Sequence, residues 1–151
     1  MKYRDVDTQF GTLCVHERDG AIVALSWQAS GRCDRSEVLD AAADQLVGYD
    51  AGTVTEFDLP MHIDGSAFQR DVCAAMSAIP FGHTRTYGDI ARDLGVPAQA
   101  IGQACGANPI PILIPCHRVM GAKGLTGFSG AGGVETKVAL LRHEGAASLL
   151  I

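Results

Sequence analysis

Residues 108–121 read NPIPILIPCHRVMG and are the most informative stretch of this 151-residue chain. The stretch holds three prolines within eight residues. Because proline has no backbone N–H and restricts the residue before it, these prolines exclude a helix and favour a rigid, extended segment. That segment leads directly into an adjacent pair, Cys116 and His117.

The pair is a candidate for nucleophilic chemistry. A thiol attacks only as the thiolate, so its ordinary pKa of about 8.5 must be lowered by a nearby base or positive charge. His117 and Arg118 can supply that field, and we expect a bridging water because adjacent side chains do not normally hydrogen-bond directly. For an isolated pair, a buried cysteine beside a surface histidine would be the preferred interpretation. The surrounding sequence therefore has to decide.

Upstream of the pair, residues from about 63 to about 105 follow a helical pattern. Ser66 can cap a first helix, and Thr86 can cap a second, with Asp89 placed as in a capping box. Gly95 is suited to end the second helix, and Pro97 to the first turn of a third. Two short helices joined in this way resemble a helix-turn-helix, although the pattern alone favours an ordinary corner between two helices.

The first 62 residues predict a small α/β unit. Residues 11–17 and 21–27 have the composition of strands, and Asp19-Gly20 between them is a strong hairpin signal. Residues 36–49 carry apolar side chains at helical spacing, with Ser36 as the candidate cap.

Charge and composition restrict the possible functions. The net charge is −5, but residues 1–62 carry five Lys/Arg against eleven Asp/Glu, whereas residues 63–151 carry seven against six. The second part is therefore compatible with a nucleic-acid partner. No apolar run is long enough for a membrane span and the N-terminus has no signal-peptide core, so a cytoplasmic protein is expected. Five cysteines without a CxxC pair predict neither a disulfide framework nor a metal site.

The stretch at 108–119 closely resembles the active-site signature of the O6-alkylguanine-DNA alkyltransferases. The resemblance continues in FQRDVCAAMSAIPFGHTRTYGDIARDLGVP at 68–97 and in LTGFSGAGGVETKVALLRHEG at 125–145. Residues 45–60 resemble the region between the family's two domains, so the similarity covers about two thirds of the chain.

The resemblance implies an α/β fold in two parts. An N-terminal β-hairpin or sheet-plus-helix domain, ribonuclease H-like, would span residues 1–62 and serve as structural support. A mainly helical helix-turn-helix domain, winged-helix-like, would span residues 63–151 and carry DNA binding and alkyl transfer.

The activity implied is direct-reversal DNA repair. The alkyl group of O6-alkylguanine would move irreversibly to a cysteine in one turnover, without cofactor or metal; O4-alkylthymine is a further candidate substrate. The partner would be double-stranded DNA, bound through its minor groove with the damaged base flipped out. A monomer is expected.

The resemblance also implies individual roles. Cys116 would accept the alkyl group, Glu144 would orient His117, and His117 would act through water to hold the thiolate. Asn108 would brace the active-site turn, and Tyr87 would donate a proton to the departing purine. The substrate pocket would be formed by Tyr87, Phe128, Ser129 and Val119. DNA would be contacted by Thr86, Pro97, Ala98, Gln99, Ala100, Gly102 and Arg118. Gln99 stands where the family usually has an arginine that fills the gap left by the flipped base.

Two other functions are compatible with parts of the sequence. A non-catalytic protein that senses alkylated DNA would look similar, but such relatives lack the cysteine that is present here as Cys116. A cysteine hydrolase with a Cys-His-Glu arrangement would need an oxyanion hole, for which the sequence offers no candidate.

Overall fold

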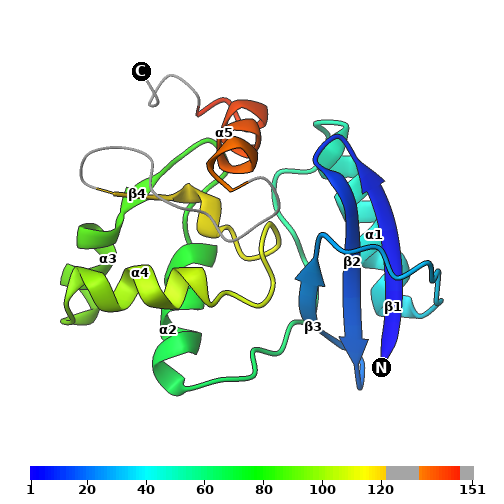
Figure 1. Ribbon diagram of the computed structural model, residues 1–151, viewed down its shortest axis with the longest axis horizontal. Helices are drawn as coiled ribbons and strands as arrows, with labels where there is room; N and C mark the ends of the chain where they lie inside the picture. Colours follow the sequence, from blue (N-terminus) through cyan, green and yellow to red (C-terminus); the bar gives the residue numbers. More distant parts are fainter. Residues whose placement is uncertain (122–132, 147–151) are drawn as a thin grey trace. The chain divides into compact units, whose positions relative to one another are not determined.

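The structure of the chain, a computed structural model, describes residues 1–121 and 133–146. The chain forms two compact units, Met1–Asp64 and Gly65–Ile151 (Figure 1). No helix within the described ranges is long and apolar enough to cross a membrane.

The N-terminal unit is an antiparallel sheet covered by one helix (Figure 1). Its strands lie in the order β1-β2-β3, and their bounds are β1 Lys2–Thr8, β2 Gly11–Arg18 and β3 Ala21–Ser26. The predicted hairpin is confirmed: Asp19 and Gly20 join β2 to β3, both with positive φ, at 52° and 81°. Strand β1 was not predicted.

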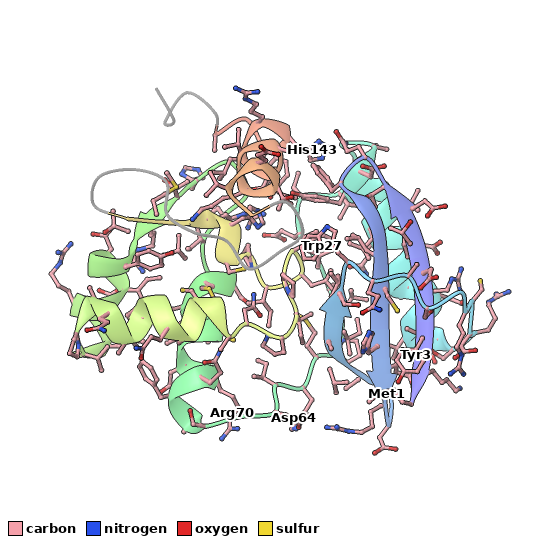
Figure 2. The ribbon with its side chains drawn as sticks, in the orientation of Figure 1. Met1, Tyr3, Trp27, Asp64, Arg70 and His143 are labelled. Carbon is pink, nitrogen blue, oxygen red and sulfur yellow. The ribbon has the colours of Figure 1, made fainter. Side chains whose placement is uncertain are left out.

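Helix α1, Glu37–Asp50, supplies the other half of this unit's core. Ser36 caps it as predicted, accepting a hydrogen bond from the backbone N–H of Leu39 at 3.0 Å. The apolar stripe of α1 is buried with the inward side chains of the sheet, namely Leu13, Val15, Ile22, Leu39 and Leu46. Trp27, labelled in Figure 2, donates its indole N–H to the Phe10 carbonyl at 3.1 Å.

The C-terminal unit is mainly helical, as predicted. Its helices are α2 Ala67–Ser77, α3 Tyr87–Leu94, α4 Ala98–Gly106 and α5 Val134–His143. Two short strands, β4 Arg85–Thr86 and β5 Val119–Met120, pair in parallel. A single 3-10 turn, η1 Cys116–Arg118, precedes β5.

Helices α3 and α4 pack side by side in a helix-turn-helix (Figure 1). Thr86 and Asp89 form the predicted capping box, in which each side chain accepts a hydrogen bond from the other residue's backbone N–H. Gly95 ends α3 in the left-handed conformation, with φ 69°, which a side chain would disfavour. Pro97 lies just before α4, as its cap residue.

The prediction of an extended segment before Cys116 is wrong. The backbone N–H of Ile114 donates to the Ile110 carbonyl at 2.8 Å, so the chain turns sharply there, and Ile112 has a positive φ of 69°. Beyond it, the Arg118 N–H donates to the Pro115 carbonyl at 3.0 Å, which forms η1. Prolines exclude a long helix, but a proline at the start of one turn costs nothing because its missing N–H is not needed there.

Candidate active site

Cys116 begins the single turn η1 and is buried, with 5% of its surface exposed. The loop before it is tied together by Asn108, whose side-chain Nδ2 donates to the Ile114 carbonyl at 2.8 Å. The Oδ1 atom of Asn108 accepts from the Ile110 N–H at 3.0 Å. The Cys116 N–H donates to the same Ile114 carbonyl at 2.8 Å. Asn108 therefore lies where the sequence predicted a brace for the active-site turn.

His117 and Glu144, which are 27 positions apart in the chain, meet in the interior. Nε2 of His117 lies 2.7 Å from Oε2 of Glu144, and both side chains are fully buried. Burial lowers the pKa of His117, and the Glu144 carboxylate opposes this effect. A neutral imidazole that donates from Nε2 keeps its lone pair on Nδ1. Nδ1 is buried and has no hydrogen-bond partner among the described residues, so it is the atom able to accept a proton.

Glu144 also binds Arg118, and this pair is a finding that the sequence did not indicate. Arg118 donates from Nε to Oε1 at 2.8 Å and from Nη2 to Oε2 at 3.1 Å. Its Nη1 donates to the Ile79 carbonyl at 2.7 Å. The predicted contact of Arg118 with DNA does not fit this arrangement, because the guanidinium is buried and engaged by Glu144 and Ile79.

Lys137 is a buried cation that sequence reasoning missed. It lies on α5 with only 1% of its surface exposed, and its Nζ donates to the Val119 carbonyl at 2.6 Å. Burial lowers the pKa of Lys137, and negative charge on the sulfur of Cys116 or Cys105 opposes the shift. The sequence contains a signal for this burial. Lys137 has the spacing i, i+3, i+4, i+7 with Leu140, Leu141 and Glu144, which places all four on one face of the helix, and the other three are also buried.

The surroundings of Cys116 have opposing effects on the pKa of its thiol. Burial raises the pKa of its thiol, whereas the Asn108 side chain and the Lys137 cation lower it. Burial, reinforced by Cys116, raises the pKa of Cys105 to about 12, so that thiol stays protonated and inert. Cys116 is thus the buried thiol that has both a cation and an amide to stabilise its anion.

The helix-turn-helix carries a second group of predicted residues. A cavity of about 570 Å³ is lined by Tyr87, Gly88, Ala98, Gln99, Gly102 and Gln103. Tyr87 is the first residue of α3, and its side chain is half-buried. Thr86 and Pro97 cap the two helices, and Ala100 is a half-buried residue of α4.

The predicted substrate residues are placed differently from one another. Val119 is fully buried in β5, where its carbonyl accepts the Lys137 hydrogen bond. Phe128 and Ser129 lie outside the described residues.

Figure 2 labels His143, the last residue of α5, which directly precedes Glu144. Within the described ranges, no group of three or more His, Cys, Asp or Glu side chains is arranged to hold a metal ion.

A buried thiol next to a histidine that contacts a buried carboxylate is the arrangement expected of a protein with an activated cysteine nucleophile, and here it lies in the same unit as a helix-turn-helix. The sequence model of the family described as "6-O-methylguanine DNA methyltransferase, DNA binding domain" matches residues 67–146. The methylated-DNA–protein-cysteine methyltransferase of Mycobacterium bovis is 51% identical over 154 residues, covering 95% of this chain and 92% of the relative. The chain belongs to this family of methyltransferases.

Solved structures agree with the family and with the α/β fold. The Mycobacterium tuberculosis O6-methylguanine methyltransferase has a TM-score of 0.85 at 38% identity, covering 97% of this chain and 93% of that chain. A structure of Mycobacterium tuberculosis OGT in complex with DNA has a TM-score of 0.85 at 39% identity, covering 97% of this chain and 94% of that chain. The fold class predicted from the sequence is confirmed.

Proposed function

We propose that this chain repairs DNA directly, by transferring the alkyl group of O6-alkylguanine to its own Cys116 in one irreversible turnover. The observation that carries the proposal is the buried contact of His117 with Glu144 beside a thiol that Lys137 and Asn108 stabilise. The family supports the reaction type, since its curated members are named methylated-DNA–protein-cysteine methyltransferases. No cofactor is needed, because the protein itself is the acceptor.

The reaction balances with the groups at hand. Nδ1 of His117 takes the thiol proton of Cys116 through a water molecule, while Glu144 stabilises the imidazolium that forms. The thiolate attacks the alkyl carbon; a carbon–sulfur bond forms and the bond from that carbon to O6 breaks. The electron pair passes to guanine, and Tyr87 donates a proton so that the base leaves neutral. The proton taken from Cys116 then replaces the one lost by Tyr87, so that the residues end with no net change of charge. The thioether has no hydrolytic route back, so one protein repairs one lesion.

The DNA partner is proposed from the same reasoning. O6 of a stacked guanine is inaccessible to a buried thiol, so the base must be flipped out of double-stranded DNA. Helix α4 would enter the minor groove, with the contacts made by Thr86, Pro97, Ala98, Gln99, Ala100 and Gly102. Tyr87, Val119, Phe128 and Ser129 would form the base pocket. Catalysis and DNA binding would thus belong to the C-terminal part, with structural support from the N-terminal part; the monomeric state and cytoplasmic location stay predictions.

Mass spectrometry after incubation with O6-methylguanine DNA tests the proposal. We expect a stoichiometric gain of one methyl group on the peptide that contains Cys116. Cys116→Ala should abolish transfer and leave binding of the lesion measurable. Cys33→Ala, which removes the exposed cysteine of the N-terminal unit, is the matched control and should react normally. A methyl group found on another cysteine, with Cys116 unmodified, would contradict the assignment.

A further inference from the structure

Helix α4 presents two glutamine amides toward the same cavity. Gln103 follows Gln99 by four residues, so the two side chains lie on one face of the helix. Both are exposed, and both line the cavity at Tyr87. Neither side-chain amide has a hydrogen-bond partner in the part of the chain that the structure describes.

The surface between the two amides is open. A Cβ atom built on Gly102 would meet nothing within 4 Å, so packing within the protein does not require glycine there. Glycine weakens a helix relative to alanine, and here no intramolecular contact explains its presence. The open space leaves the Gln103 amide accessible to a bound molecule.

We propose that Gln103 reads a base pair flanking the extrahelical nucleotide, and that it prefers G·C. The inference rests on the proposed function and on binding in the minor groove. Four residues of helix rise by about 6 Å, which is roughly two base steps of about 3.4 Å each. With Gln99 at the gap left by the flipped base, Gln103 therefore reaches a base pair within about two steps of the gap, and this is the flanking pair meant here.

The preference follows from the hydrogen-bonding groups. In the minor groove an A·T pair offers only acceptors, whereas a G·C pair adds the N2 amino donor of guanine. A glutamine amide has both a donor and an acceptor, so it can satisfy both kinds of group on G·C. Without Gln103, Gln99 at the gap would make no hydrogen bond to this flanking base pair.

The test compares duplexes whose flanking pair is G·C or inosine·C, since inosine lacks only the N2 amino group. We expect the unsubstituted protein to bind the inosine duplex about three- to tenfold more weakly and to react with it more slowly at subsaturating concentration. The Gln103→Ala protein should bind both duplexes about as weakly as the unsubstituted protein binds the inosine duplex. It should therefore no longer distinguish the two duplexes. Gln28→Ala, which removes an exposed amide from the N-terminal unit, should behave like the unsubstituted protein.

Two outcomes would overturn the inference: Gln103→Ala binding the G·C duplex normally, or keeping its full response to inosine. Reaction with free O6-benzylguanine separates this failure from failure of the proposed function, because the free base needs no contact from α4. If the unsubstituted protein takes an alkyl group neither from the free base nor from O6-methylguanine DNA, the proposed function fails. The binding comparison then still decides the role of Gln103.

Discussion

Glu144 contacts His117 at 2.7 Å inside the C-terminal unit, and the same carboxylate also binds Arg118. The two contacts have opposite consequences for the imidazole. Burial lowers the pKa of His117; the carboxylate opposes this effect, whereas the cation of Arg118 adds to it. The carboxylate therefore favours the protonated form of His117, against the effects of burial and of Arg118.

Glu144→Gln should slow alkyl transfer and move its pH–rate profile to higher pH. Removing the carboxylate weakens His117 as a base, so less of Cys116 is thiolate at a given pH. The protein should also lose about 3–5 kcal/mol of stability, because Arg118 is left buried without its counter-ion. Single-turnover rates with free O6-benzylguanine across pH, beside denaturant unfolding, measure both effects.

Arg118→Gln is the matched control for this prediction. It breaks the same buried ion pair and should be destabilised by a similar amount, but it removes the cation that lowers the pKa of His117. Its pH–rate profile should therefore not move to higher pH. Superimposable profiles for Glu144→Gln and the unsubstituted protein would show that Glu144 is a structural residue at the end of α5 and does not affect His117 as a base.

Local signals in the sequence predicted much of the fold. Serine or threonine at Ser36, Ser66 and Thr86 caps a helix through its own side chain, so these starts depend on a few neighbouring residues. Strand β1 was missed because its sequence, KYRDVDT, is mostly polar. It is held at the edge of the sheet by backbone pairing with β2, which a single segment does not reveal.

The site was predictable only where the family resemblance supplied the partners. His117 and Glu144 lie far apart in the sequence, and no local rule connects them. The burial of Arg118 was misjudged and that of Lys137 was missed for one physical reason: charged residues are ordinarily exposed, and burial becomes tolerable only with a suitable partner. Those partners, the Glu144 carboxylate and the Val119 carbonyl, come from other segments.

Lys137→Met should raise the pKa of the Cys116 thiol and slow transfer at neutral pH. The lysine cation lowers that pKa, and methionine keeps much of the volume without the charge. Iodoacetamide labelling of Cys116 as a function of pH measures the thiol directly. Lys137→Arg, which keeps the charge, should retain most of the reactivity; equal loss in both variants would mean that packing, and not charge, is the contribution of Lys137.

Stability should fall as the pH is lowered from about 7 to 5. Burial lowers the pKa of His117 and of His16 below the ordinary value of 6.5. In that range the unfolded chain binds protons that the folded protein does not, so the free energy of unfolding decreases with decreasing pH. The slope is limited to about 1.4 kcal/mol per pH unit for each histidine. Urea unfolding at several pH values measures it.

His117→Gln provides the comparison for the pH dependence. The glutamine amide can still donate to Glu144, but it does not titrate. The slope between pH 6.5 and 5 should decrease to the part contributed by His16. An unchanged slope would show that His117 gains its proton as readily in the folded protein as in the unfolded chain.

Gln99→Arg should speed repair of duplex DNA while leaving the reaction with free O6-benzylguanine nearly unchanged. Gln99 is exposed at the start of α4 and lines the cavity at Tyr87, where the family usually has an arginine. Glutamine keeps part of the volume but has neither a charge nor a guanidinium plane to stack in the gap left by the flipped base. The added cation lies in the first turn of α4, so stability should fall by no more than about 1 kcal/mol.

The two substrates separate base flipping from chemistry, because the free base needs no flipping and reports the thiolate alone. An arginine that contacts a phosphate would steepen the dependence of log K on log salt by about one unit, whereas an arginine stacked inside the duplex would change that slope less and the flipping equilibrium more. Equal rates of both proteins on duplex DNA, measured in single turnover with saturating protein, would show that flipping does not depend on an arginine here. Equal acceleration on both substrates would instead mean that the substitution reaches Cys116, and that Gln99 does not lie at the gap in the DNA.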